Sequence, residues 1–463
     1  MPLFTQSQVL SAISGRLLVA GGRDCESVST DTRTLTPDAL YFAIRGENSN
    51  GHKYLNDAKN KRASIAVIDE YIQGINYRDV VSGEWSIIEV TDSLFALGQL
   101  AKFHRSRFST PFVGITGSAG KTTVKEMTAS ILSAQFNTLK SQGNYNNEIG
   151  LPLTLFGLDG SKERGVVEFG MRGFGQIGYL ASIVRPHVAT ITNIGRSHLE
   201  ILGSQENIAT AKAEILEYLQ KNGTAILPKD DAYYDFLRDH LTFSQDVVSF
   251  GTTNKADVYP ENITFDNMGR ATFLFNCVGV EKFPITLSVP GTVQVINALA
   301  AAAASLSLSA TFECVKEGLE NYIPDTSRMR LLESKKGYTI VDDTYNANPE
   351  AMAVALNYME HVKLTGKKIA ILADMLELGP KSKEFHLEVG EKARKIGIES
   401  LICIGEYAKF YAEGFGQNAV LFENNENALD FAQSIIGAGD IVFVKGSHSM
   451  NLIQVVSELY KDE

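Results

Sequence analysis

The sequence predicts an α/β protein built from three domains. Its 463 residues exceed what one hydrophobic core usually organises, and at ~150 residues per domain they correspond to about three domains. From residue 111 the chain alternates buried strands, tight turns and helices, and after about residue 325 a second alternation of the same kind begins. This alternation is typical of a parallel sheet covered by helices. We therefore expect a small α/β domain followed by two doubly wound domains.

The composition, 44% hydrophobic and 21% charged residues, is that of an ordinary globular protein. The 43 Lys and Arg against 54 Asp and Glu give a net charge of −11, so no nucleic-acid partner is expected. Four widely spaced cysteines and the lack of a secretory signal predict a cytoplasmic protein with reduced thiols. The uncharged stretch 283–312 is interrupted by prolines and polar residues, so we expect no membrane insertion.

Residues 1–88 are predicted to form the small N-terminal α/β domain. The short runs SVSTDTR, ALYFAIRG, ASIAVID and WSIIEVT read as strands separated by turns rich in Gly, Asn and Asp. The segment that follows, DSLFALGQLAKFHRSRF, reads as an amphipathic connecting helix. Its apolar side carries Leu94, Leu97 and Ala101.

Residues 89–324 are predicted to form the central domain. The runs PFVGIT, RGVVEFG, HVATITNIG and GTAILP read as buried strands near helical segments, which indicates a doubly wound, mostly parallel sheet. Between about residues 244 and 290, the runs VVSFG, DVYPENITF, ATFLFNCV and ITLSV predict β-hairpins.

Residues 325–463 are predicted to form a C-terminal Rossmann-like domain. The strands YTIVDD, KKIAILAD, SLICIG, AVLFE and DIVFVKG alternate with helical segments. Ligands gather at the carboxyl ends of the strands in such sheets. Those ends offer Asp342, Asp343, Asp374 and Lys445 here.

The strongest motif is GITGSAGKTT, residues 114–123, between a predicted buried strand and a helix. A glycine-rich turn at a helix N-terminus presents several backbone N–H groups to one anion, and the helix dipole adds to that field. The spacing departs from the usual Walker form, which would need Gly where Ile115 stands. We nevertheless predict a P-loop-type ATP site, in which the lysine reaches the β/γ-phosphates and the first threonine ligates Mg²⁺. Its residues are Gly117, Ser118, Ala119, Gly120, Lys121, Thr122 and Thr123.

Two side chains follow neighbouring strands of the same predicted sheet. Glu168 ends the apolar run GVVEFG, and a carboxylate in that place favours a ligand of Mg²⁺ over a simple edge residue. His198 follows the strand HVATI and would lie at the same edge, where a packed histidine is an equal alternative.

Lys212 is the most unusual residue of the sequence. In SQENIATAKAEILEYLQ it lies on the helical stripe formed by Ile208, Ile215 and Leu219. Lysine is rarely buried without a partner, and a desolvated ammonium has a lowered pKa, so its neutral amine can react. The alternative is a side chain that extends along the stripe to reach water, and the spacing leaves both open.

Two other motifs suggest different classes of protein. The segment 173–178, GFGQIG, matches GxGxxG, and with Glu200 it would fit a dinucleotide-dependent oxidoreductase, although the motif alone is weak. The segment 254–257, NKAD, resembles the guanine-reading element of a nucleotide-gated switch. It stands before the DxxG of residues 266–269, which is the wrong order, so a turn is the favoured interpretation.

With these residues placed, the chain resembles the Mur ligase family, the ATP-dependent amide-forming enzymes of peptidoglycan assembly. The family motifs TGxxGKT, ExG, TNIxxxHL and AKxEI match residues 116–122, 168–170, 192–199 and 211–215, and the resemblance covers essentially the whole length. It implies that Lys121, Glu168, His198 and Lys212 are catalytic. Two Mg²⁺ ions are implied, one held by Thr122 and Glu168, the other served by His198 and by Lys212 in carbamylated form.

The resemblance also implies the substrates. The stretches GNYNNEIGLPLTL, DDTYNANPEAM, ADMLELG and KGSHSMNL are similar to the family's ligases that join D-alanyl-D-alanine to UDP-N-acetylmuramoyl-tripeptide through an acyl phosphate, and the DNPR marker of the diaminopimelate-adding relative is absent. Such an enzyme is implied to act as a monomer. The implied uridine-nucleotide contacts are Ser29, Thr30, Asp31, Arg33, Gly46 and His52. The implied peptide and dipeptide contacts are Asn144, Asn146, Asn147, Tyr345, Asn346, Asn348, Asp374, His386 and Lys445.

The sequence departs from the family pattern at two nucleotide-binding segments. The family's GxHNxxN appears as GTVQVIN, residues 291–297, which retains Asn297 as the implied adenine contact, and PGRM appears as TSRM, which leaves Arg328 as the implied phosphate contact. Asp343 is the remaining implied cofactor residue. A folate-adding synthetase would share the ATP chemistry, but it would need a pterin site in place of the STDTR-type region.

Overall fold

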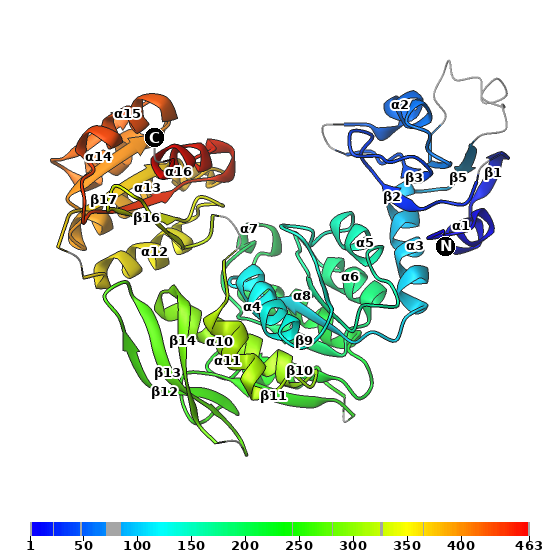
Figure 1. Ribbon diagram of the computed structural model, residues 1–463, viewed down its shortest axis with the longest axis horizontal. Helices are drawn as coiled ribbons and strands as arrows, with labels where there is room; N and C mark the ends of the chain where they lie inside the picture. Colours follow the sequence, from blue (N-terminus) through cyan, green and yellow to red (C-terminus); the bar gives the residue numbers. More distant parts are fainter. Residues whose placement is uncertain are drawn as a thin grey trace. The chain divides into compact units, whose positions relative to one another are not determined.

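The computed structural model describes residues 2–21, 23–46, 49–70, 85–242, 244–279, 281–324, 327–363 and 365–461 (Figure 1). The chain divides into two compact units. The first unit comprises Met1–Ser249 with Ala300–Thr311, and the second comprises Phe250–Leu299 with Phe312–Glu463. Both contain largely parallel sheets with helices, so the predicted α/β class is confirmed. Among the described residues, no helix has the length and apolarity needed to cross a bilayer.

The N-terminal sheet of the first unit has the strand order β1-β5-β4-β3-β2. Strands β2 to β5 are parallel, and β1 pairs antiparallel with β5. All residues of β3 and β4 are buried, as expected for strands covered on both faces. The elements are α1 Gln6–Ile13, β1 Arg16–Val19, β2 Ser27–Ser29, β3 Ala39–Phe42, η1 Gly51–Tyr54, α2 Leu55–Asn60, β4 Ile65–Ile68 and β5 Ser86–Glu89.

The predicted connecting helix is α3, Ser93–Ser106, and it contributes to two hydrophobic cores. Leu97 and Leu100 pack in the N-terminal core, whereas Ala101 packs in the core of the central sheet. The central elements are β6 Phe112–Thr116, α4 Lys121–Ser133, β7 Thr138–Lys140, α5 Gly150–Leu155, β8 Arg164–Glu168, α6 Gln176–Val184, β9 Val188–Ile191, α7 Leu199–Leu202, α8 Gln205–Glu217, β10 Thr224–Pro228 and α9 Tyr234–Arg238.

The order of the central strands determines where a ligand can bind. The strands run β10-β9-β6-β8-β7, all parallel, with β6 between β9 and β8. The chain leaves β6 toward one side of the sheet and later returns to its other side, which makes β6 a topological switch point. The segments that follow β6, β8 and β9 therefore meet at one edge of the sheet.

The region predicted as hairpins belongs partly to each unit, and the prediction is wrong for its first strand, because β11 pairs in parallel with β12. Strand β12 pairs with β13, and β13 pairs with β14. The elements of this region are β11 Asp246–Phe250, β12 Val258–Phe265, β13 Arg270–Cys277, β14 Phe283–Pro290, α10 Thr292–Leu306 and α11 Phe312–Glu320.

The C-terminal sheet has the order β15-β16-β20-β17-β18-β19, with only β15 antiparallel. Alternate strand residues enter two separate cores, one containing Val341 and Leu372 and the other containing Ile340 and Ile371, so helices cover both faces. The predicted Rossmann-like alternation is confirmed. Its elements are β15 Arg330–Glu333, β16 Thr339–Asp342, α12 Pro349–His361, β17 Lys368–Ala373, η2 Gly379–Lys381, α13 Ser382–Lys395, β18 Ser400–Ile404, α14 Ala408–Phe415, β19 Ala419–Phe422, α15 Asn425–Ile435, β20 Ile441–Lys445, η3 His448–Met450 and α16 Ile453–Tyr460.

Candidate active site

The glycine-rich segment connects β6 to α4 as the sequence predicts. At Gly117 the backbone has φ 152°, and a Cβ there would lie 1.8 Å from Thr192 Oγ1, so a side chain does not fit. Gly120 precedes α4 with φ 79°, and no side chain caps the helix. Because the first N–H groups of a helix have no acceptor within it, this end of α4 suits an anion.

Two residues after β9, Thr192 and Asn193, hold this loop, and no signal in the sequence singled out either of them for this role. The Asn193 carbonyl and side-chain oxygen accept hydrogen bonds from the N–H groups of Ser118 and Ala119, at 3.1 and 3.0 Å. Thr192 donates its hydroxyl to the Ala119 carbonyl at 2.5 Å. Lys121 reaches back to the Gly117 and Ser118 carbonyls, at 2.9 and 3.3 Å. The loop shape is thus determined by the neighbouring strand end.

Glu168 ends β8 with 2% of its surface exposed. Thr122 Oγ1 donates to its Oε2 and Asn146 Nδ2 donates to its Oε1, each at 2.8 Å. Thr123 lies beside Thr122 in the first turn of α4. The structure therefore brings together a phosphate loop, a threonine hydroxyl and a buried carboxylate, and these hard oxygen donors fit Mg²⁺.

Lys212 lies on α8 with 1% of its surface exposed, which excludes the alternative of a side chain extended to water. Burial lowers the pKa of Lys212 well below its usual value, and the positive charge of Lys121 lowers it further. Within the described part of the chain, its ammonium group has no hydrogen bond or ion pair. The lowered pKa favours the neutral form of the Lys212 amine, which lies close to Lys121 of the phosphate loop.

His198 precedes α7 in the left-handed region, with φ 68°. Burial lowers its pKa, and so do the charges of Lys212, Lys121 and Arg172. No motif in the sequence singled out Arg172. Lys212, Lys121 and Arg172 therefore lie near enough to His198 to disfavour its protonated form.

Four of the N-terminal residues with implied uridine contacts, Ser29, Thr30, Asp31 and Arg33, lie at the end of β2 and in the turn that follows it. Ser29 donates its hydroxyl to the Asp31 carbonyl at 2.9 Å, and Arg33 pairs with the Asp31 carboxylate at 2.7 Å. Thr30, between them, is half-buried, and Gly46 is exposed on a separate loop.

His52 is fully buried, and both of its ring nitrogens are engaged. Nδ1 donates to Asn50 Oδ1 at 2.8 Å, and Nε2 accepts from the Asp69 N–H at 3.1 Å. Burial lowers the pKa of His52. Its neutral ring therefore fixes the loop that precedes α2.

The loop 141–147 lies between β7 and α5. Asn146 contacts Glu168 from it, and Asn147, which precedes α5, accepts a hydrogen bond from the N–H of Gly150, the first residue of α5, at 2.8 Å. Asn144 is exposed at the loop surface. One asparagine thus contacts a candidate metal ligand, while another shapes the helix start.

At the carboxyl end of β20, Lys445 forms a buried ion pair. Its ammonium group lies 2.5 Å from Asp343 Oδ2 and donates to the Asn346 carbonyl at 2.8 Å. Asn348 begins α12 by accepting from the Ala351 N–H at 2.8 Å. Lys445 therefore anchors the segment that links β16 to α12.

Asp374 follows β17 and is buried. Its carboxylate accepts the N–H groups of Glu406 and Tyr407, at 2.8 and 3.1 Å. Burial raises the pKa of Asp374, and these two hydrogen bonds oppose the rise. Gly405 is required here, because a Cβ on it would lie 2.4 Å from Asp374 Oδ2.

His386 is fully buried on α13, and backbone groups engage both of its nitrogens. Nε2 accepts from the Met375 N–H at 2.9 Å, and Nδ1 donates to the Ser382 carbonyl at 2.6 Å. Burial lowers the pKa of His386, and its ring stacks on Tyr407 with centroids 5.0 Å apart. In this arrangement His386 is a neutral ring that holds the turn after β17.

The two remaining implied nucleotide contacts lie in the second unit. The Arg328 guanidinium lies 3.7 Å from the centroid of the Tyr345 ring. Tyr345 donates its N–H to the Ser327 carbonyl at 2.9 Å, which ties the turn to the loop after β16. Asn297 is buried near the start of α10 and donates to Gln294 Oε1 at 3.0 Å.

The GxGxxG segment is already occupied by the chain's own carboxylate. Glu214 on α8 accepts the N–H of Gly175 at 2.6 Å and that of Gly178 at 2.9 Å. A dinucleotide pyrophosphate would have to displace this carboxylate, so the site does not fit the oxidoreductase hypothesis. The side chain of Glu200 lies outside the described residues.

The NKAD segment, residues 254–257, lies in the turn region between β11 and β12. The predicted turn is therefore confirmed. A guanine-reading element would instead stand at the end of a buried parallel strand.

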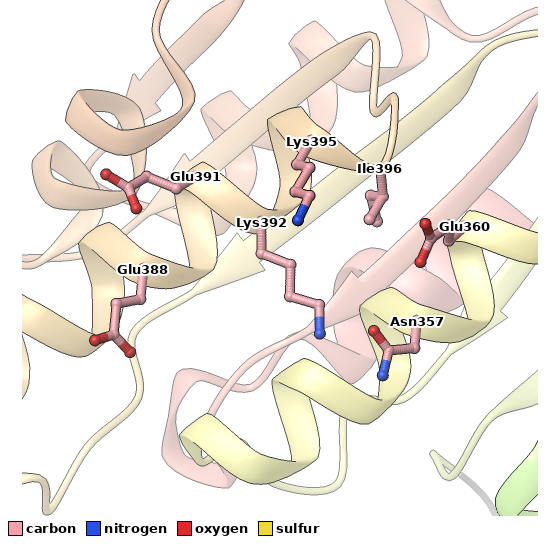
Figure 2. A pocket seen from close by; sticks show the side chains of 7 residues that line it. All are labelled: Asn357, Glu360, Glu388, Glu391, Lys392, Lys395 and Ile396. Atoms are coloured by element: carbon pink, nitrogen blue, oxygen red, sulfur yellow. The ribbon is translucent and has the colours of Figure 1, made fainter.

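The second unit also contains a shallow groove of about 390 Å³ between α12 and α13 (Figure 2). Figure 2 shows Lys392 extending from α13 toward α12, where it donates to the Ala353 carbonyl at 3.0 Å. The groove is lined by charges of both signs and contains none of the predicted site residues. The lining residues are Asn357, Glu360, Glu388, Glu391, Lys392, Lys395 and Ile396.

The phosphate loop, the carboxylate that ends the next strand and the buried lysine define the class of protein. Residues 115–305 match the Mur ligase middle domain, and residues 327–448 match the Mur ligase, glutamate ligase domain. The chain belongs to the Mur ligase family, as its motifs predict, and it is an ATP-dependent peptide ligase.

Among its relatives, the UDP-N-acetylmuramoyl-tripeptide–D-alanyl-D-alanine ligase of Escherichia coli strain K12 is 33% identical over 99% of this chain and 98% of its own length. A crystal structure of MurF from Acinetobacter baumannii superposes with a TM-score of 0.89 at 28% identity, over 99% of each chain. MurF ligase from Thermotoga maritima in complex with ADP has a TM-score of 0.78 at 27% identity, over 94% of this chain and 96% of that one.

Proposed function

We propose that this chain joins D-alanyl-D-alanine to UDP-N-acetylmuramoyl-tripeptide and converts ATP to ADP and phosphate. The main support for this proposal is the grouping of the phosphate loop, Glu168 and the buried Lys212 at one edge of the central sheet. Similarity along the whole length to ligases of this specificity, the N-terminal region included, supports the choice of substrates over a folate.

In this proposal each of the three predicted domains binds a different substrate. Residues 1–88 hold the uridine nucleotide with the turn Ser29–Arg33 and the loop of Gly46 and His52. Residues 89–324 hold ATP, and residues 325–463 hold the incoming dipeptide with the loops anchored by Asp374, His386 and Lys445. Asn297, Arg328 and Asp343 complete the nucleotide contacts.

The reaction begins when the tripeptide's terminal carboxylate attacks the γ-phosphorus of ATP. The bond to the bridging oxygen breaks, ADP leaves, and an acyl phosphate forms. The amine of D-alanyl-D-alanine then attacks the acyl carbon, the amide bond forms, phosphate leaves, and the amine proton passes to solvent. The acyl phosphate hydrolyses readily, so the site must exclude water until the amine arrives.

A carboxylate that attacks a polyanion needs positive charge around it, and this chain's residues supply that charge. The N–H groups at the start of α4 and the Lys121 ammonium bind the phosphates. In this proposal Thr122 and Glu168 hold one Mg²⁺ and His198 and Lys212 serve a second. Bound Mg²⁺ would neutralise charge on the transferred phosphoryl group.

Lys212 acts in this proposal as a carbamate. Its neutral amine attacks the carbon of CO₂, an N–C bond forms, and one proton leaves the nitrogen for solvent. The product is an anionic oxygen ligand, which removes the cost of a buried ammonium. Burial next to a second lysine, which lowers the pKa of Lys212 and so favours the neutral amine, supports this step.

Phosphate release from ATP tests the proposed reaction. We expect fast release when UDP-N-acetylmuramoyl-tripeptide and D-alanyl-D-alanine are both present, with an amide product detected by mass spectrometry. Omission of either substrate is the control. Equal release without the dipeptide, or a preference for a folate substrate, would show that the assignment is wrong.

The carbamate has its own test. Lys212→Ala should lower the rate about 10²-fold or more, as loss of a metal-site residue does, and short carboxylic acids added to the buffer should restore part of it. Lys221→Ala, on a surface turn of the same unit, is the matched control. A Lys212→Ala variant with full activity would exclude the carbamate.

The remaining parts of the proposal concern assembly and compartment. We propose a monomer, as the family resemblance implies, and light scattering in the presence of ATP measures its mass. The use of ATP and the four free cysteine thiols support a cytoplasmic reaction.

A further inference from the structure

Lys125 is a buried cation that the reaction outlined above does not use. It lies one helical turn after Lys121 on α4, and its side chain is fully buried. A buried ammonium is costly unless several acceptors surround it. The acceptors around Lys125 therefore indicate what it holds in place.

The Lys125 ammonium has three acceptors. It donates to the Ser141 carbonyl at 2.8 Å and to the Gly143 carbonyl at 3.2 Å, and it pairs with Glu126 Oε1 at 2.9 Å. Glu126 also pairs with Lys140 through its other oxygen. Two of the three acceptors are thus backbone groups of the loop 141–147.

That loop contacts Glu168 at both of its ends. The Ser141 hydroxyl accepts from the Glu168 N–H at 3.4 Å, and Asn146 donates to Glu168 Oε1 at 2.8 Å. The Gly170 N–H donates to the Asn146 carbonyl at 2.8 Å, so the loop is joined to the chain on either side of Glu168.

We propose that Lys125 is a positioning residue that fixes the loop 141–147, and through Asn146 the orientation of the Glu168 carboxylate. The helix that carries Lys125 also carries Thr122, which contacts the other oxygen of Glu168 at 2.8 Å. One rigid helix therefore sets both oxygens of the carboxylate relative to the phosphate loop. The inference rests on the proposed function for its catalytic consequence only.

Lys125→Met tests this role, because it removes the donor and keeps a similar apolar length. We expect amide hydrogen exchange in residues 142–147 to become about tenfold faster or more. The Mg²⁺ concentration that gives half the maximal rate should rise about tenfold, while the calorimetric affinity for ATP stays within about threefold.

Glu126→Gln is the matched control, because it removes a charge beside Lys125 but keeps an oxygen acceptor and leaves both loop carbonyls bonded. We expect its loop exchange and Mg²⁺ dependence to stay within about threefold of the wild type. If Lys125→Met behaves like this control, Lys125 does not position the loop.

Asn146→Ala separates the contact between Lys125 and the loop from the contact between the loop and Glu168. Lys125 remains in place in this variant, and only the side-chain contact with Glu168 is lost. It should raise the Mg²⁺ requirement as Lys125→Met does. The double variant should be no worse than the more impaired single variant, since both changes break one chain of contacts. Effects that multiply would overturn the proposal.

If Lys125→Met does not fold, Lys125→Arg supplies the test. It keeps the charge, but its longer, planar guanidinium holds its N–H bonds in fixed directions, so the geometry of the two carbonyl contacts must change, and we expect loop exchange to rise about threefold or more. An unchanged exchange rate would reject the proposal. A wild type without substrate-dependent phosphate release would contradict the proposed function instead, and the exchange comparison would still decide the role of Lys125.

Discussion

The two units each contain a parallel-sheet edge with predicted site residues, but the buried lysine at the first edge, Lys212, and the one at the second, Lys445, differ in their partners. In the first unit, Lys212 is buried and no described residue bonds or pairs with its ammonium group. In the second unit, Lys445 pairs with Asp343 and donates to backbone carbonyls, and His386 has both ring nitrogens bonded.

This difference separates two kinds of buried polar group. A buried charge that lacks a partner costs free energy, so it persists where a ligand or a modification compensates it. A buried charge with all of its partners costs little and makes the surrounding loops rigid. We infer that the first edge performs chemistry and that the second edge gives its loops their shape.

The largest expected effect is on the stability of the second unit. Lys445→Met removes one member of a buried pair and leaves the Asp343 carboxylate uncompensated, so we expect a loss of about 3–5 kcal/mol. Hydrogen exchange of the β20 amides measures it locally, which avoids treating two units as one transition. Lys445→Met combined with Asp343→Asn should recover much of the loss, and a single variant as stable as the wild type would remove the basis of the comparison.

The corresponding substitution in the first unit, Lys121→Ala, should lower the rate of the reaction and leave the stability nearly unchanged. Lys121→Ala removes a half-buried donor to the phosphates, so we expect phosphate release to fall about 10²–10³-fold. The free energy of opening that hydrogen exchange reports for the β6 amides should change by less than about 1 kcal/mol. Lys102→Ala, on the exposed side of α3, is the control for a surface lysine. A rate close to that of the wild type would place the phosphate site elsewhere.

The sequence predicted the first edge better than the second, for a physical reason. The residues Gly117 to Thr122 are adjacent in the chain, and Lys212 is conspicuous because a cation interrupts an apolar stripe of period 3.6. Both signals are local. The spacing left burial and extension to water both open for Lys212, and the structure shows that the side chain is buried.

The partners of these residues could not be predicted in the same way. Lys125 faces the carbonyls of residues 141 and 143, and Asn193 faces the phosphate loop, which are contacts between segments far apart in the sequence. The role of His386 as a donor and acceptor for two backbone groups also depends on folding. Its position in the sequence, in the helical segment after the strand KKIAILAD, does not show which backbone groups it contacts.

The pH dependence of stability tests whether His386 is held neutral. His386→Gln should cost about 1–3 kcal/mol at neutral pH, because two buried backbone groups lose their partner. Burial lowers the pKa of His386 in the folded state, so below about pH 6.5 the unfolded chain binds a proton that the folded chain does not.

The wild type therefore loses stability through His386 as the pH falls below about 6.5, and the glutamine variant does not. We expect the difference between the two proteins to narrow between about pH 7.5 and pH 5. Hydrogen exchange of the β17 amides, corrected for intrinsic rates, measures this difference. A gap that widens on acidification would mean that His386 is protonated in the folded protein, against the neutral ring that its two hydrogen bonds require.

The smallest expected effect comes from Glu214, which allows a comparison within the first unit. Glu214 lies two residues from Lys212 on α8, but both of its carboxylate oxygens accept hydrogen bonds. Its carboxylate accepts two N–H groups at the start of α6, so it resembles the compensated groups of the second unit. Glu214→Gln should cost about 1 kcal/mol, since a helix N-terminus loses an anion and one N–H meets an amide. We expect the rate of phosphate release to change by less than about threefold. A large loss of rate with little loss of stability would show that Glu214 takes part in the reaction. A charged group whose hydrogen bonds are all satisfied could then not be assumed to have only a structural role.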